Sequence, residues 1–122
     1  MQNNNSSKNN SYITNEQIMS NILADMTYAS AHWISEVRTS ISYKLLIGEC
    51  VEDKWFNCLK NGGKLIIIDN EDYEEHTVNF KQLSKAISSV RHQPRFKDET
   101  SWDEYFVDNI IQIAVFGEVV FG

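Results

Sequence analysis

The segment from residue 91 to residue 97 gathers the groups that could bind a phosphorylated ligand. It reads Arg91-His92-Gln93-Pro94-Arg95-Phe96-Lys97 and holds three of the eleven basic residues of the chain. Guanidinium groups match the oxygens of a phosphate, and an aromatic ring can stack on a nucleobase. We therefore predict a nucleotide-binding site that uses Arg91, His92, Arg95, Phe96 and Lys97. Alternatively, the cations only complement a helix C-terminus and pair with nearby carboxylates.

A second candidate surface combines Trp33 and Arg38, with Tyr28 and Tyr43 nearby in the sequence. Trp33 could instead belong to the core, because large aromatic side chains dominate the interior of small domains. If the strand that carries Arg38 lies near residues 91–97, the two sets form one pocket.

Two acidic stretches offer other chemistry. Residues 69–76 supply several hard oxygen ligands for a divalent cation, but they lack the glycine and terminal glutamate of a calcium-binding hand. A solvated hairpin turn accounts for them, and we predict no metal site. A second group of carboxylates, spread over eleven residues, could imitate the phosphates of a nucleic acid or simply solvate a helix: Asp98, Glu99, Asp103, Glu104 and Asp108.

The sequence does not favour catalysis. His32, His76 and His92 lie on separate predicted elements, and neither an HExxH nor a GxSxG motif occurs. Gly62-Gly63 follows a predicted helix, whereas a phosphate-binding loop follows a strand, so the pair is expected to end that helix. We predict a protein that is not an enzyme and uses no cofactor.

The predicted elements must position these groups. Apolar spacing and a capping box at Thr14 and Gln17 indicate a helix over residues 15–27. Residues 32–46 are rich in β-branched and aromatic side chains and are read as one or two strands. On them Trp33, Ser35 and Val37 share one face, and Ile34, Glu36 and Arg38 share the other.

Helices and strands also alternate in the predicted second half of the chain. A helix over residues 50–61 precedes a buried strand over 64–69, and residues 75–78 return antiparallel to it. A capping signal at Asn79 predicts a helix that ends near His92. A second capping signal, formed by Ser101 and Glu104, predicts a helix that starts at Ser101 and ends at Gly117. The prediction is an α+β fold, a small antiparallel sheet packed with about four helices. Residues 1–14 are expected to be a disordered tail, and 15–122 a single domain.

The overall charge limits the classes of molecule that the protein is expected to bind. Seventeen Asp and Glu against eleven Lys and Arg give a formal charge of −6, which argues against binding duplex nucleic acid. The apolar runs are shorter than the roughly 20 residues of a membrane span, and residues 1–14 do not resemble a secretory signal. We expect a cytoplasmic protein that contacts no membrane. Cys50 and Cys58 are expected to be buried free thiols.

Three sequence segments resemble a family of small proteins from phages and mobile elements of Gram-positive bacteria. They are residues 32–37 with their Trp, residues 58–69 with Asn61-Gly62-Gly63, and residues 109–122 with Phe116-Gly117-Glu118. Relatives carry a small glycine-containing run before the Trp, where this chain has residues 28–32. The resemblance implies a phage accessory protein in an infected bacterial host cell.

Phage accessory proteins of this size often act against host immunity, which suggests two functions. One is a non-catalytic protein that sequesters a nucleotide immune signal, such as an ADP-ribose derivative or a cyclic oligonucleotide. The other is an acidic inhibitor, of the anti-CRISPR or anti-restriction type, that binds a host defence protein by phosphate mimicry. We favour the first, because the basic segment contrasts with the acidic chain; a structural or regulatory protein of the phage particle is a third interpretation. Homo-oligomers are expected, with the apolar end at Val119, Val120 and Phe121 as a contact surface.

Overall fold

The computed structural model describes residues 14–97 and 102–122 and shows the predicted small α+β fold. Residues 1–13 of the predicted tail lie outside the described residues, while Thr14 is the N-cap of the first helix. The elements are, in chain order, α2 (Asn15–Ala29), β1 (Ile34–Thr39), η1 (Tyr43–Leu45), α3 (Val51–Lys60), β2 (Lys64–Asp69), β3 (Glu75–Asn79), α4 (Phe80–Val90), α5 (Pro94–Lys97) and α6 (Glu104–Phe116).

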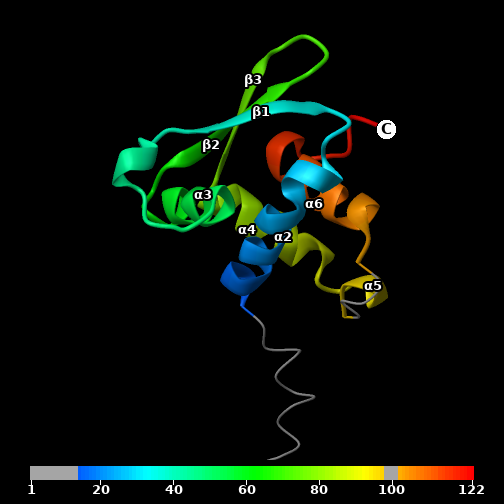
Figure 1. Cartoon of the computed structure of the whole chain (residues 1–122). Helices are drawn as coiled ribbons and strands as arrows, with labels where there is room; N and C mark the ends of the chain where they lie inside the picture. Colours follow the sequence, from blue (N-terminus) through cyan, green and yellow to red (C-terminus); the bar gives the residue numbers. More distant parts are fainter. Residues whose placement is uncertain (1–13, 98–101) are drawn as a thin grey trace, which may run out of the picture.

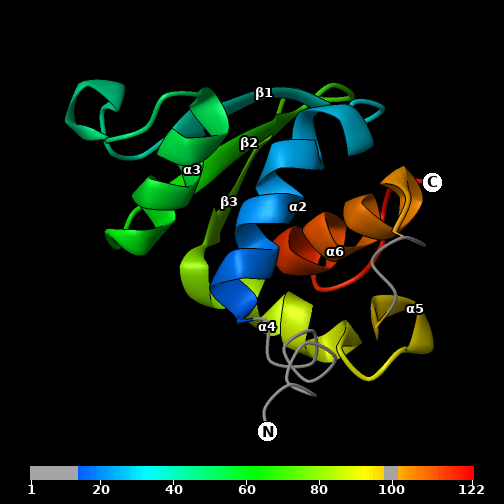
Figure 2. The same ribbon diagram turned by 60° about the horizontal axis from the view of Figure 1, so that its bottom comes forward.

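The strands form an antiparallel sheet in the order β1-β2-β3, with helices packed on one of its faces (Figure 1). Helix α2 packs against α3, α4 and α6, and α6 also contacts β3. Figure 2 shows α2 and α6 between the sheet and α5, so the sheet and α5 lie at opposite ends of the molecule. No helix among the described residues is long and apolar enough to cross a membrane.

The hydrophobic core lies between the sheet and the helices. Ile18, Ile22 and Met26 project from α2 into it, as their spacing predicts. Leu65 and Ile67 of β2 meet them from the sheet, because alternate side chains of a strand point to one face. Capping boxes start α2 at Thr14 with Gln17 and α4 at Asn79 with Gln82, both as predicted.

The segment 32–46 forms only one strand, and its faces differ from the prediction. A bulge between Ile34 and Glu36 shifts the register, so that Ile34 pairs with Asp69 and packs against the core. Ser35 is exposed, and Glu36 shares the outer face with Arg38. After Thr39 the chain leaves the sheet and forms η1, whose loop exposes Leu45 and Ile47.

Helix α6 begins at Glu104, with Asp103 as its N-cap; the Asp103 side chain accepts a hydrogen bond from the Phe106 N–H. The predicted start at Ser101 lies outside the described residues. Gly117 ends the helix in the left-handed conformation, as predicted. The predicted loop after His92 instead contains α5, which starts at Pro94, because the fixed φ of proline suits the first position of a helix.

Gly62 and Gly63 end α3 in a Schellman motif. The Gly63 N–H donates to the carbonyl of Cys58 and the Gly62 N–H to that of Leu59, while Gly62 has a φ of +85°. The two glycines are needed for different reasons. A Cβ on Gly62 would meet nothing within 4 Å, whereas one on Gly63 would lie 2.7 Å from Cys58 Sγ and 2.9 Å from Ile41 Cδ1. This close packing joins the end of α3 to the chain that follows β1.

Alanine at these two positions should therefore have unequal costs. We expect Gly62→Ala to lower the free energy of unfolding by about 1 kcal/mol, through left-handed strain alone. Gly63→Ala should lower it by about 2 kcal/mol or more, because the added methyl group overpacks a filled space. Urea denaturation of the two variants tests this. A Gly63→Ala cost no larger than that of Gly62→Ala would contradict the tight packing.

Candidate functional site

The carboxylate of Asp108, which is only 3% exposed, has four hydrogen-bond partners from two parts of the chain. Its Oδ1 accepts hydrogen bonds from Ser30 Oγ at 2.6 Å and from Trp33 Nε1 at 2.8 Å. Its Oδ2 lies 2.7 Å from His32 Nε2 and accepts from Gln112 Nε2 at 2.8 Å. Four partners compensate the desolvation of a buried carboxylate.

Local structure brings these partners to one point. Helix α2 stops at Ala29, where the Ser30 N–H still donates to Met26 O, and the Trp33 N–H then donates to Ser30 O. This turn directs the side chains of Ser30, His32 and Trp33 toward α6. The Trp33 carbonyl accepts from the Asn70 N–H at 2.8 Å, which also ties the turn to the β2–β3 hairpin.

Gln112 extends the network to the end of the chain. One helical turn after Asp108, its Oε1 accepts from the N–H groups of Val120 and Phe121, both at 2.8 Å, and its Nε2 also donates to Phe121 O. The Phe121 ring stacks on Trp33, with a centroid distance of 5.1 Å and planes 10° apart. The C-terminal segment thus closes over the indole that Asp108 holds.

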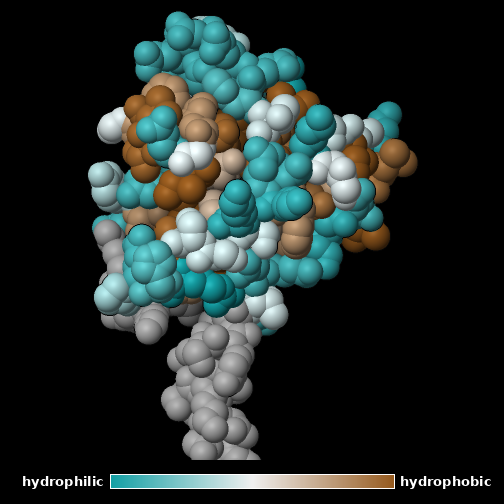
Figure 3. All heavy atoms as spheres, turned by 180° about the vertical axis from the view of Figure 1, so that it is seen from behind, coloured by the Kyte–Doolittle hydropathy of each residue, from teal (hydrophilic) through white to brown (hydrophobic). Residues whose placement is uncertain are grey.

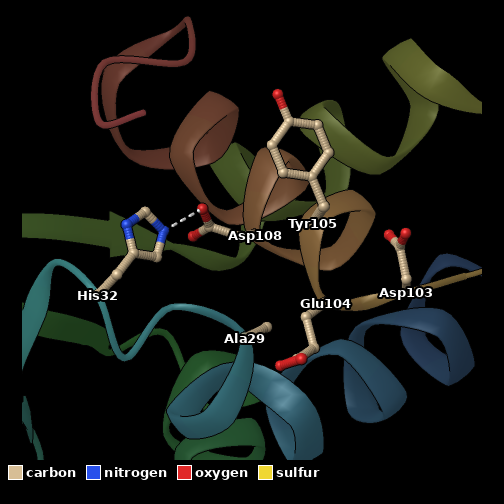
Figure 4. A pocket seen from close by; sticks show the side chains of 6 residues that line it. All are labelled: Ala29, His32, Asp103, Glu104, Tyr105 and Asp108. Atoms are coloured by element: carbon tan, nitrogen blue, oxygen red, sulfur yellow. Dashed lines mark hydrogen bonds and ion pairs between the residues drawn. The ribbon is translucent and has the colours of Figure 1, made fainter.

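An open depression of about 330 Å³ lies beside this network, between the end of α2 and the start of α6 (Figure 4). Its floor includes Asp108 with His32, and its rim includes exposed Asp103, Glu104 and Tyr105. The six residues that line it, with Ala29 as the apolar member, include no lysine or arginine. The depression therefore presents carboxylates, an imidazole and a phenol.

The depression offers charged and hydrogen-bonding side chains. Asp108 orients the His32 ring, whose side chain is 43% exposed. Ser30 donates to Asp108 and not to His32, so this serine, histidine and aspartate do not form the relay that activates a hydroxyl for nucleophilic attack. A cationic group is the natural complement of such a surface.

The structure separates the two halves of the predicted nucleotide site. Trp33 is 1% exposed and belongs to the core, because its ring is enclosed by Phe116 and Phe121. Arg38 is exposed on β1 and pairs with Glu36 at 2.7 Å. The sheet lies at the opposite end of the molecule from α5 (Figures 1 and 2), so Arg38 and residues 91–97 do not share a pocket.

Within the basic segment, two of the predicted residues already have intramolecular roles. Arg91 Nε and Nη2 donate to Asn15 Oδ1 at 2.9 and 2.7 Å, and its guanidinium lies 5.4 Å from the centroid of the Phe96 ring. Phe96 is 8% exposed and packs against Trp102, so its ring is not presented to solvent. His92 is exposed. The backbones of Arg95 and Lys97 belong to α5, but their side chains lie outside what the structure describes.

Three further predictions need correction. Asp108 is buried, so it is not part of an exposed row of carboxylates; Asp103 and Glu104 are exposed, and Asp98 and Glu99 lie outside the described residues. Phe121 packs on Trp33 and is not a free contact surface, although Val119 and Val120 are exposed. Cys58 is buried as predicted, whereas Cys50 is exposed.

Sequence reasoning missed Ser30, Asp108 and Gln112 as one network. A signal existed in Asp108 and Gln112, two polar residues one turn apart in a helix otherwise rich in buried apolar side chains. Buried polar groups need partners, so this pair predicts donors on a facing element. The partners could not be identified from the sequence, since Ser30 and Trp33 lie more than seventy residues away.

No protein-family model, curated protein or solved structure matches this chain. The resemblance to small phage proteins therefore stays a hypothesis, and the site has to be interpreted from its own geometry.

Replacing Asp108 should show how far the fold depends on it. We expect Asp108→Ala to lower the free energy of unfolding by about 3 kcal/mol or more, because it leaves buried donors without an acceptor. Asp108→Asn keeps one acceptor oxygen and should cost less. Chemical denaturation measures both. Asp25→Ala, which removes an exposed carboxylate of α2, is the control and should change stability by less than about 0.5 kcal/mol. Equal effects at the two positions would contradict the structural role of Asp108.

Proposed function

We propose that this protein is a non-catalytic acidic binding protein that receives a basic group of a protein partner in the depression at the start of α6. The observation that carries the proposal is the lining: three carboxylates, a histidine and a tyrosine, with no lysine or arginine among the six lining residues. A lysine or arginine side chain matches this surface in both charge and hydrogen bonding.

The exposed rim supplies the contacts that such a partner would use. Glu104 can accept a salt bridge from a cation that enters the depression, and Tyr105, which is 65% exposed, offers a ring face for a cation–π contact. Asp108 and His32 are held by the network beneath them, so part of the surface is organised before binding. Little conformational entropy would then be lost there on association.

The charge of the whole chain supports the same role. A formal charge of −6 accelerates encounter with a basic surface at physiological salt and disfavours encounter with nucleic acid. An inhibitor that covers the nucleic-acid groove of a host defence effector needs these properties. The phage context of that inhibitor rests on the sequence resemblance alone.

A charge reversal at the rim tests the proposal. The immobilised chain is used to capture proteins from a bacterial lysate, and the affinity of each purified partner is then measured for wild type and for Glu104→Lys. We expect at least about a tenfold loss of affinity and a weaker salt dependence for Glu104→Lys, because a like charge replaces an attractive one. Asp103 is not a suitable position, since its side chain caps α6.

Glu49→Lys is the matched control. It makes the same charge change at an exposed carboxylate in the segment between η1 and α3, which lies on the opposite side of the molecule from the start of α6 (Figure 1). Affinity should fall by less than about twofold for this variant, because salt screens the effect of a charge that lies far from the bound partner. Equal losses for the two variants would mean that the partner responds to net charge and not to this depression, and would overturn the proposal.

A second candidate is sequestration of a nucleotide-type immune signal by residues 91–97. It is favoured by the clustering of Arg91 and exposed His92 at the end of α4, directly before Arg95 and Lys97 in α5. Trp33 and Phe96 are buried and do not support it with an open ring.

This alternative has a separate test. Mass spectrometry of protein purified from infected cells and then heated should detect a released nucleotide, and calorimetry should show at least about a tenfold weaker affinity for that nucleotide in Arg95→Ala, because a charge-assisted contact to phosphate is lost. Glu104→Lys should leave this affinity unchanged, which separates the two candidates. Full affinity in Arg95→Ala would exclude the basic segment as the site.

A further inference from the structure

A second histidine–aspartate pair lies at the closed end of the β2–β3 hairpin, outside the depression. Asp69 Oδ2 is 2.7 Å from His76 Nε2, and Glu74 lies beside them. One ligand atom from each of Asp69, Glu74 and His76 falls within 4.8 Å of the others. This is the one such cluster of metal-ligating side chains among the described residues, at a turn that forms a hydrophilic cap at the top of the molecule (Figure 3).

The Asp69 side chain is held in place before any ligand arrives. Its Oδ1 accepts hydrogen bonds from the N–H groups of Glu71, Asp72 and Tyr73, at 3.0, 2.7 and 3.2 Å. The Asp72 N–H and then the His76 ring hold the pKa of Asp69 below its ordinary value. Since Oδ1 is occupied by the turn, Oδ2 is the atom that faces His76.

The His76 ring is also fixed. It comes from β3, and its edge packs against Phe116 with a centroid distance of 4.9 Å and planes 74° apart. The side chain is 21% exposed, so the imidazole stays reachable from solvent. Glu74 is exposed, and its backbone carbonyl accepts from the Asp69 N–H, which places it next to the pair.

We propose that Asp69 Oδ2, Glu74 and His76 Nε2 bind a divalent transition metal ion, with zinc as the reference ion. Tetrahedral zinc with bonds of about 2.0–2.1 Å separates neighbouring ligand atoms by roughly 3.3 Å. The pair at 2.7 Å would have to open by less than about 1 Å, and the exposed Glu74 side chain would turn inward. The metal lies between Nε2 and Oδ2 and is bound by the neutral ring through Nε2; the one ring proton moves through solvent from Nε2 to Nδ1, so no net proton is released.

The ligand set favours a transition metal over calcium or magnesium. Calcium takes six to eight oxygen ligands, and magnesium prefers an octahedral shell of oxygens, whereas one imidazole with two carboxylates suits zinc. Three protein ligands leave a fourth position for water or for a donor from another molecule. His32 and Asp108 make an equally short pair without joining such a cluster, so they serve as an internal comparison.

The test uses the full chain with Cys50→Ser as the background, because Cys50 is an exposed thiol that could bind zinc by itself. Zinc is titrated in millimolar magnesium and followed by the melting temperature, and cobalt(II) is titrated for its visible absorption. We expect one zinc ion per chain and a rise in the melting temperature with zinc concentration. Glu74→Gln and His76→Gln should each weaken binding by at least about tenfold, because each removes a ligand.

Two matched variants control for charge and for histidine content. Glu71→Gln removes an exposed carboxylate from the same turn, and His32→Gln removes the histidine of the other pair; both should keep the affinity within about twofold. The proposal is overturned if Glu71→Gln weakens binding as much as Glu74→Gln, since the acidic turn would then attract cations diffusely. It is also overturned if His32→Gln abolishes binding, or if zinc leaves the melting temperature unchanged. Glu74 is exposed, so its variant is expected to fold and the test remains decisive.

Discussion

The buried carboxylate of Asp108 is the interaction on which most of this structure depends. It joins the turn after α2, helix α6 and, through Gln112, the C-terminal segment, three parts of the chain that have no backbone ladder in common. Burying a carboxylate costs free energy unless hydrogen-bond donors surround it. Only the correct arrangement of these three parts of the chain supplies the donors. The network therefore stabilises this packing of α2 on α6 relative to others that would bury the same apolar area.

The same network links the fold to the proposed binding surface. His32 and Asp108 form the floor of the depression, and Asp103 both caps α6 and lines the rim. Substitutions at these positions would change stability and binding together. Glu104 and Tyr105 are exposed on the first turn of the helix and are the positions at which recognition can be altered without removing a structural contact.

The sequence was most informative where local patterns decide the structure. The capping boxes of α2 and α4, the buried strand β2 and the glycine end of α3 are all set by neighbours a few residues apart, and the structure confirms them. The face of Ile34 could not be predicted, because a bulge depends on the partner strand. Two residues of the predicted nucleotide site illustrate a similar limit: Arg91 and Phe96 look like ligand contacts in a linear segment, but in the fold Arg91 donates to Asn15 and Phe96 packs against Trp102.

The location of the charges, more than their sum, decides what this protein can bind. Two histidine–aspartate pairs flank the aromatic cluster of Trp33, Phe116 and Phe121, and each Asp is buried while its histidine reaches the surface. The two pairs differ in the groups that contact each aspartate. Asp108 is saturated by side-chain donors from distant elements, which makes it a structural centre under an acidic depression. Asp69 uses one oxygen for its own turn and keeps the other near His76 and a second carboxylate, and the proposed zinc site rests on this arrangement.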